Sequence, residues 1–254
     1  MKFEVHLPCN QLLPYVKHLI ISENENSVAY KVLPDTALVI GFQYRGKLSY
    51  IDNGRETLLA TSGITGLRDS YRIFNNTAGI GSVLVVFREN GAARFIRAPL
   101  HELFDESLSL DHFFDRSTLS EIEEQLALAA DDKARIKLIE GFLIDQLNDR
   151  QPDILIAHAL EHIHASKGTI RINELATLLN TSASPLEKRF RQEVGASPKK
   201  FSMIVRAQNV LAAMDNGKQH YSEYLSSYYD QAHFIKDFKK FASITPEQYL
   251  KTLK

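Results

Sequence analysis

Basic side chains suited to binding phosphate are concentrated in the last third of this 254-residue chain. Lys188, Arg189 and Arg191 lie close together on a stretch whose apolar residues, Leu186 and Phe190, recur at helical spacing. That spacing predicts an amphipathic helix with an apolar back and a cationic front. Such charges usually belong to an ordinary solvated face. The elements around them decide between that interpretation and nucleic-acid binding.

A second stretch, Tyr228–Phe241, has the same design, with Phe234 and Phe238 on its apolar back. Gln231 and His233 stand near its start and lysines follow. Amides and imidazoles read base edges, and ammonium groups neutralise the phosphate backbone. The side chains predicted to contact double-stranded DNA in the two stretches are Ser182, Ser184, Glu187, Lys188, Arg189, Arg191, Tyr229, Asp230, Gln231, His233, Lys236 and Lys239.

The first basic stretch is preceded by a helix and a tight turn. Leu175 and Leu179 share a face of that helix, which we expect to end at Asn180 because Asn tolerates left-handed backbone. Ser184, followed by Pro and then Glu187, predicts the N-cap of the next helix. A helix, a tight turn and a capped basic helix form a helix-turn-helix unit, whose second helix enters the major groove.

A second such unit is predicted after a long helix that begins at Pro198. Gly195 ends the preceding basic helix. Tyr221, Tyr224 and Tyr228 share one helical face, more typical of a core than of a stacking surface. Asp230 caps the helix that carries Gln231 and His233, with its phenylalanines packed inward.

In these residues the chain resembles the AraC-type family of bacterial transcription regulators, which carry two helix-turn-helix units joined by a long helix. The match covers roughly residues 155–252. It consists of Glu174-Leu175-Ala176, Ser182 with Leu186 and Phe190, Gly195-x-Ser197-Pro198, Arg206, Asp230-Gln231-x-His233-Phe234 with Phe238, and Thr245-Pro246. The resemblance implies sequence-specific DNA binding, with RNA polymerase as a partner if the protein is an activator. Glu223 and Ser227 depart from the family's small residue and turn glycine, which favours a weaker second unit.

The N-terminal part is predicted to be a small β-barrel or sandwich, cupin-like, so that the whole chain is α+β. Short runs rich in β-branched and aromatic residues are separated by turn residues, as at Asn53-Gly54. The predicted strands cover 37–44, 47–52, 55–61, 70–76 and 82–89. The segments LPYV, VLPD and VFRENGAARFIRAPLHEL resemble the sensor domain found ahead of such regulators. An effector-binding role for this part is what that resemblance implies.

Helical periodicity replaces the strand pattern after about residue 91. Asp131–Leu147 is predicted to be amphipathic through Ile136, Ile139 and Leu143, and is a candidate homodimer contact. Gln151-Pro152 marks the predicted boundary between a sensor and dimerisation domain, 1–150, and a DNA-binding domain, 151–254. The second part holds 14 Lys/Arg and 10 Asp/Glu, a net +4 that leaves −5 for the first.

Composition limits the remaining classes of protein. The chain is 44% hydrophobic and 24% charged, and has one cysteine, Cys9. It therefore has no disulfide framework and no thiolate zinc cage. No secretion signal is recognisable in the first residues, and no apolar run is long enough for a membrane span. These features predict a soluble, cytoplasmic protein without a membrane partner.

Two alternatives to a DNA-binding regulator stay open. An enzyme that uses the barrel would usually need histidine ligands, and residues 30–90 contain neither His nor Cys. His158, His162 and His164 lack a nearby completing ligand, so neither metal nor cofactor is expected. The other alternative is a degenerate regulator that acts through protein partners. Strand alternation suggests an effector pocket lined by Phe42, Tyr44, Tyr71 and Phe87.

Overall fold

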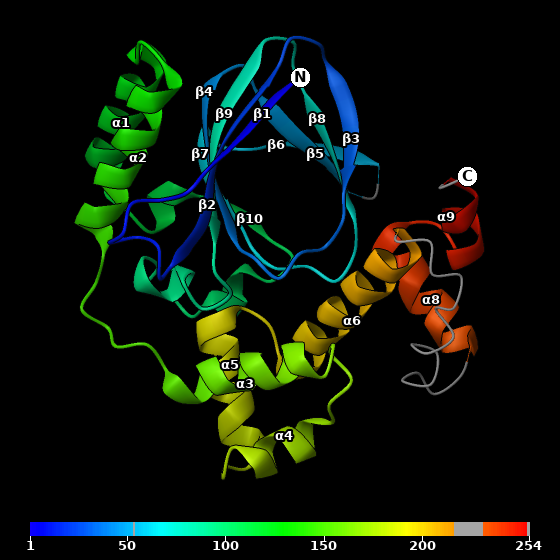
Figure 1. The fold of residues 1–254 in the computed structure, drawn as a ribbon. Coiled ribbons are helices and arrows are strands. Elements are labelled where there is room, and N and C mark those ends of the chain that lie inside the picture. The colour runs from blue at the N-terminus through cyan, green and yellow to red at the C-terminus, as the bar shows by residue number, and fades with distance from the viewer. Residues whose placement is uncertain (53, 216–230, 253–254) are drawn as a thin grey trace.

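The computed structural model describes residues 1–52, 54–215 and 231–252, and the chain has the predicted α+β class (Figure 1). The N-terminal part is a sandwich of two antiparallel sheets. The larger sheet has the order β1 (Lys2–His6), β2 (Val16–Asn24), β9 (Ile80–Phe87), β4 (Val39–Arg45), β7 (Ser62–Thr65) and β10 (Ser107–Ser109). The smaller sheet has the order β3 (Val28–Val32), β8 (Arg72–Asn76), β5 (Leu48–Asp52) and β6 (Arg55–Leu58).

Two antiparallel helices cover the larger sheet on the side away from the smaller one (Figure 1). They are α1 (Arg116–Leu128) and α2 (Asp132–Gln146). Ile139 and Leu143 of α2 are fully buried, and Phe142 meets Phe42 of β4 edge to face, with ring centroids 5.7 Å apart. The apolar face that made this helix a candidate dimer contact therefore packs inside the chain. A homodimer would need another surface.

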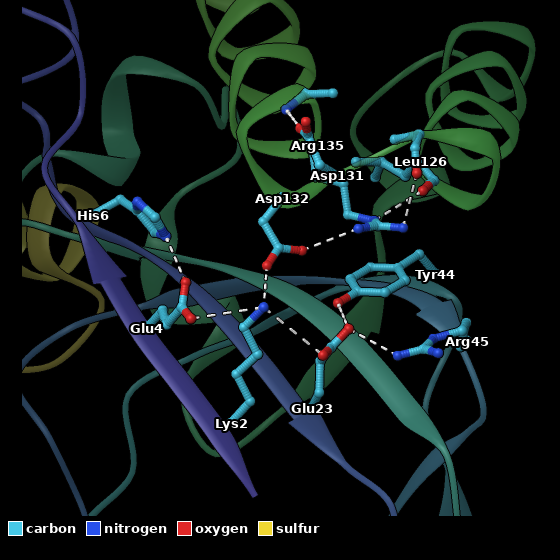
Figure 2. A network of polar contacts seen from close by, with 12 residues as sticks. Lys2, Glu4, His6, Glu23, Tyr44, Arg45, Leu126, Asp131, Asp132 and Arg135 are labelled. Carbon is cyan, nitrogen blue, oxygen red and sulfur yellow. Dashed lines mark hydrogen bonds and ion pairs between the residues drawn. The ribbon is translucent and has the colours of Figure 1, made fainter.

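A network of charged groups joins α2 to the strands beneath it (Figure 2). Lys2 of β1 donates to Asp132 at the start of α2, and this bond holds the pKa of the Asp132 carboxyl below its ordinary value. The Tyr44 hydroxyl donates to Glu23 Oε1 at 2.7 Å, and burial together with this bond raises the pKa of that phenol. Arg135 covers the Tyr44 ring, with its guanidinium carbon 4.2 Å from the centroid.

The remaining helices form the C-terminal part below and beside the sandwich in Figure 1. They are α3 (Ile154–Ala165), α4 (Ile172–Leu178), α5 (Ala183–Val194), α6 (Pro198–Asp215), α8 (Gln231–Ala242) and α9 (Pro246–Thr252). One buried apolar core runs from Leu12 through the outer face of the larger sheet and α2 to Val205 of α6. A second, smaller core joins α6, α8 and α9, and Leu33 of the N-terminal part packs against it.

The structure adds elements that the sequence pattern did not indicate. Strands β1, β2, β3, β7 and β10 lie outside the predicted runs. The stretch from 91 to 104 contains two short 3-10 helices, η1 (Ala92–Arg94) and η2 (Leu100–Leu103), where helical periodicity was noted. Asn53 of the predicted hairpin turn lies outside the described residues, and Gly54 has φ +79°.

Candidate nucleic-acid interface

The first helix-turn-helix unit is formed by α4 and α5. Leu175 and Ala176 bury α4, and Asn180 has φ +50°, which confirms the left-handed turn expected of this asparagine. The predicted N-cap at Ser184 is wrong. The helix begins at Ala183 after Ser182, whose extended backbone (φ −101°, ψ 162°) makes it the N-cap. Pro185 is accommodated in the first turn, where its missing N–H has no intrahelical partner to lose.

The two faces of α5 divide as the spacing predicted. Leu186, Phe190 and Val194 are fully buried, and Phe190 meets Phe201 of α6 edge to face at 5.5 Å. The opposite face is exposed over all six residues predicted from this helix and its cap. They are Ser182, Ser184, Glu187, Lys188, Arg189 and Arg191. Side chains available to a groove are thus supported by a rigid apolar back.

Four of these six residues lie around one hollow in the protein surface. Ser184, Glu187, Lys188 and Arg191 line it together with His101 of η2. Hydroxyl, carboxylate, ammonium and guanidinium groups therefore converge on one place beside the N-terminal part. His101 was not among the predicted residues, because nothing in the sequence relates η2 to α5.

Arg189 is engaged differently from its neighbours. Its Nε and Nη2 atoms donate to the two carboxylate oxygens of Asp153, at 2.7 and 2.6 Å. Asp153 is also the N-cap of α3, since Oδ1 accepts from the Ile156 amide at 3.2 Å. This bidentate pair holds Arg189 against α3 and raises the pKa of its guanidinium.

The C-terminal end of α5 is anchored on the N-terminal part. Gly195 ends the helix with φ +94°, as predicted for this glycine. A Cβ at that position would lie 3.2 Å from the carbonyl oxygen of Leu100 in η2. Nearby, on α3, His164 Nε2 lies 2.7 Å from Glu89 Oε1 of the segment after β9. The first helix-turn-helix unit is thus fixed to the sandwich by packing and by an ion pair.

The second unit is described only in part. Phe234, Phe238 and Phe241 are buried, as predicted, and Lys236 and Lys239 are exposed on α8. Gln231 and His233 lie in α8, but their side chains are outside the described structure. Tyr229 and Asp230 are outside it altogether, as are Tyr221, Tyr224, Tyr228, Glu223 and Ser227.

One acidic residue of the sandwich contacts both α8 of this unit and the long helix α6 that precedes the unit. Asp69, in the segment between β7 and β8, lies 2.8 Å from Lys240 Nζ of α8 through Oδ1 and 3.9 Å from Lys200 Nζ of α6 through Oδ2. Its side chain is 11% exposed. Gln208 of α6 donates to Asp35 Oδ1 at 3.2 Å, which adds a second polar link to the sandwich.

The structure does not bring together the four residues suggested for an effector pocket. Phe42, Tyr44 and Phe87 are buried on the outer face of the larger sheet, against α2 and Phe95. Tyr71 is on the surface, with Lys31 Nζ 5.3 Å from its ring centroid. Alternation correctly grouped side chains by face, but it could not show which face the helices cover.

The histidines of α3 do not converge either. His158 Nδ1 lies 3.1 Å from Glu161, and His164 pairs with Glu89. Over the described ranges, no three His, Cys, Asp or Glu side chains are grouped as metal ligands would be. In the same part of the chain no helix is both long and apolar enough to cross a bilayer.

The comparisons with known proteins agree with this geometry. A family model described as a helix-turn-helix domain matches residues 175–252, and one described as a domain of unknown function (DUF6597) matches residues 4–109. The Msm operon regulatory protein of Streptococcus mutans is 26% identical over 60% of this chain and 56% of its own length. An uncharacterised HTH-type transcriptional regulator of Haemophilus influenzae is 27% identical over 46% and 39%. This chain thus spans about half the length of these relatives, or less.

Two solved structures are similar over most of the chain at low identity. ToxT from Vibrio cholerae O395 is 16% identical, covers 93% of this chain and 97% of its own, and has a TM-score of 0.44. The AraC-like transcriptional activator CuxR is 14% identical, covers 89% and 91%, and has a TM-score of 0.29.

A helix-turn-helix domain therefore follows a β-sandwich in this chain, and the two relatives are named as a regulatory protein and a transcriptional regulator. The chain thus joins a part that matches a domain of unknown function to a part that matches a helix-turn-helix domain, the order expected from its resemblance to the AraC-type regulators.

Proposed function

We propose that this protein binds specific DNA sequences through two helix-turn-helix units and that its N-terminal domain, 1–150, controls the DNA-binding domain, 151–254. α5 enters one major groove, with Ser182, Ser184, Glu187, Lys188 and Arg191 facing the bases and phosphates. α8 enters the next groove, where Lys236 and Lys239 neutralise phosphate and Gln231 and His233 read bases. Tyr229 and Asp230 complete the predicted set at the start of that helix.

The observation that carries the proposal is the exposed polar face of α5 above a fully buried apolar back. Recognition requires side chains that are free to reach base edges from a helix that does not move. Lys188 and Arg191 meet both requirements, since they are exposed while Leu186 and Phe190 beside them are buried. Arg189 is assigned a positioning role, because its Nε and Nη2 donors are both used by Asp153.

Control by the N-terminal domain is supported by the contacts between the two parts. Asp69 pairs with Lys240, Glu89 pairs with His164, and Leu100 packs at the end of α5. Each contact joins a DNA-binding helix or its neighbour to the sandwich. A change in the sandwich therefore has a short physical route to both units.

The proposal is tested by titrating the full chain against DNA from upstream of its own gene and against random duplex of equal length, at several salt concentrations. We expect tighter binding to the upstream DNA and an affinity that falls steeply with salt. Lys188→Ala is expected to lower specific affinity about tenfold or more, as loss of a groove contact does.

The matched control is Lys133→Ala on α2, an exposed lysine of the N-terminal domain that removes the same charge. It should leave both affinities within about twofold. Equal affinity for upstream and random DNA, or equal effects of the two substitutions, would overturn the assignment of α5 as the recognition helix.

A further inference from the structure

The hollow beside α5 is lined by residues from both parts of the chain. Ser184, Glu187, Lys188 and Arg191 lie at positions i, i+3, i+4 and i+7 of the helix, so they form a single stripe along it. His101 of η2 lines the same hollow, which measures about 580 Å³. A duplex that reaches this stripe therefore lies beside the N-terminal part.

Packing fixes the place of η2 relative to α5. Leu100 and Leu103 are buried, and η1 and η2 both contact α5, whose C-terminal end points toward the sandwich (Figure 1). Gly195, where α5 ends, leaves so little room that a Cβ would lie 3.2 Å from the Leu100 carbonyl oxygen. His101 follows Leu100 directly, so it is held beside the last turns of α5, where Arg191 lies.

The two ends of the stripe suit different parts of a duplex. In helix-turn-helix units, the N-terminal residues of the second helix contact base edges. A helix of 12 residues such as α5 is about 18 Å long, whereas the major groove is about 12 Å wide. The C-terminal turns of α5 therefore lie next to the phosphates that border the groove. Arg191 and His101 belong to this end of the stripe, and Ser184 belongs to the other.

The groups at the C-terminal end of the stripe are donors that suit a phosphate. Arg191 is exposed and offers a guanidinium, and an imidazole donates through the ring nitrogen that carries hydrogen. Within the described residues, the Nδ1 atom of His101 is buried and has no hydrogen-bond partner. Buried polar atoms of native proteins usually have partners, so an orphaned one calls for a further group at this place. Glu187 lies one turn nearer the N-terminal end, where carboxylates accept from cytosine amino groups.

We propose that His101 and Arg191 together bind one phosphate of the DNA backbone, so that the N-terminal domain contacts DNA directly through η2. The inference rests on the proposed function, because it adds a contact to the duplex that α5 reads. Phosphate contacts fix the register of a protein on DNA and carry no sequence information. His101 therefore contributes affinity for any duplex, and the residues nearer the start of α5 contribute the choice of sequence.

The proposal is tested by a charge series at position 101, titrated in the full chain against upstream and random duplex at several salt concentrations. His101→Ala should lower both affinities alike, by about three- to tenfold, and should reduce the salt slope by up to about one ion. His101→Glu should lower both affinities further, because its carboxylate repels the phosphate. His101→Lys should bind at least as tightly as the wild type, because it keeps a donor with a positive charge.

The matched control is the same series at His112, an exposed histidine of η3 (Leu110–His112), which packs against α1 and β7. These three variants should keep both affinities within about twofold of the wild type. Proximity is tested separately with the photocrosslinking residue p-benzoylphenylalanine. Placed at position 101 it should crosslink to bound duplex on irradiation, and placed at position 112 it should not.

Thermal unfolding and inorganic phosphate complete the design. All variants at position 101 should melt close to the wild type, because Leu100 and Leu103 supply the buried contacts of η2. Calorimetry without DNA asks whether the hollow binds a free anion instead. Submillimolar binding of inorganic phosphate that His101→Ala abolishes would assign the hollow to a free anion and overturn the contact with DNA.

The remaining outcomes separate this inference from the proposed function. Unchanged affinity and salt slope in His101→Ala, or no crosslink from position 101, would overturn the inference while Lys188→Ala still lowers specific affinity. Tighter binding by His101→Ala would show that η2 obstructs the groove, which contradicts the inference equally. A loss confined to upstream DNA would mean that His101 reads a base and not a phosphate. If Lys188→Ala has no effect, or no duplex binds, the proposed function fails and this inference fails with it.

Discussion

At the scale of single residues, the exposed cations of α5 have different tasks. Arg189→Ala removes a bidentate pair and leaves the N-cap carboxylate of Asp153 without its partner. Because the Arg189 side chain is 46% exposed, we expect a loss of at most about 1 kcal/mol in the free energy of unfolding. Urea denaturation measures it. Lys188→Ala should leave the free energy of unfolding unchanged while lowering DNA affinity. If Lys188→Ala instead lowered stability and Arg189→Ala lowered only DNA affinity, the two residues would not have these separate tasks.

The His164–Glu89 pair gives a residue-scale prediction about pH. The bond to Glu89 raises the pKa of His164 above its ordinary 6.5, against burial and the Lys17 charge. A raised histidine pKa contributes stability that is fully present below pH 6.5 and is lost as pH rises through the folded-state pKa. The melting temperature should therefore fall more between pH 6 and 8.5 in the wild type than in Glu89→Gln.

His162→Gln provides the control, because His162 is an exposed histidine on the same helix. It should keep the wild-type pH dependence. If Glu89→Gln retains that dependence as well, the pair does not fasten α3 to the sandwich between these pH values.

At the scale of elements, three glycines with different surroundings predict an ordered series of stabilities. Gly168, with φ +75°, follows α3, and an added Cβ would lie 2.2 Å from the Ser202 carbonyl oxygen. Gly195, with φ +94°, has more room. Gly141 lies in helical backbone on α2, with nothing within 4 Å. Replacing Gly168 with alanine should destabilise the protein most. The same change at Gly195 should lower the free energy of unfolding by about 1–2 kcal/mol. At Gly141 it should raise that free energy by about 0.5–1 kcal/mol.

Chemical denaturation of the three alanine variants gives the order directly. Comparable losses at 168 and 195 would mean that the α3–α6 contact yields to a methyl group. A loss of stability in Gly141→Ala would mean that the exposed face of α2 contacts another part of the protein.

The same scale explains how far sequence alone could predict the structure. Asn180, Gly195 and Pro198 are local signals, because backbone preferences of single residues set helix ends, and the helix-turn-helix unit followed from them. Strand β3 is exposed at every position. Strand β7 alternates in burial, but its buried positions are Ser62 and Ile64, so its sequence shows no apolar alternation. Phe42 and Phe87, which were suggested for an effector pocket, pack against Phe142 of α2 and Phe95, because strand alternation groups side chains by face but does not tell which face the helices cover.

At the scale of the whole molecule, the sequence did not reveal which distant segments contact one another. Asp69 and Arg68 are adjacent in sequence, yet one contacts α8 and the other the Phe74 ring of β8. Asp153 and Arg189 form their pair across two helices. No local pattern specifies such partners, which is why the candidate DNA-contacting face was predictable and its links to the sandwich were not.

The Asp69 contact leads to the prediction that belongs to this scale. While Asp69 neutralises Lys240, that lysine cannot also neutralise a phosphate. Asp69→Asn should therefore raise affinity for random duplex several-fold and steepen its salt dependence by about one ion. Lys240→Gln should have little effect on DNA affinity in the wild type and a clear effect in the Asp69→Asn background, so the two changes are non-additive.

Asp111→Asn, which changes an exposed aspartate on η3 (Leu110–His112), makes the same charge change and should alter DNA affinity little. Equal losses from Lys240→Gln in both backgrounds would show that Lys240 reaches DNA despite Asp69, and that the sandwich does not restrain α8 through this pair.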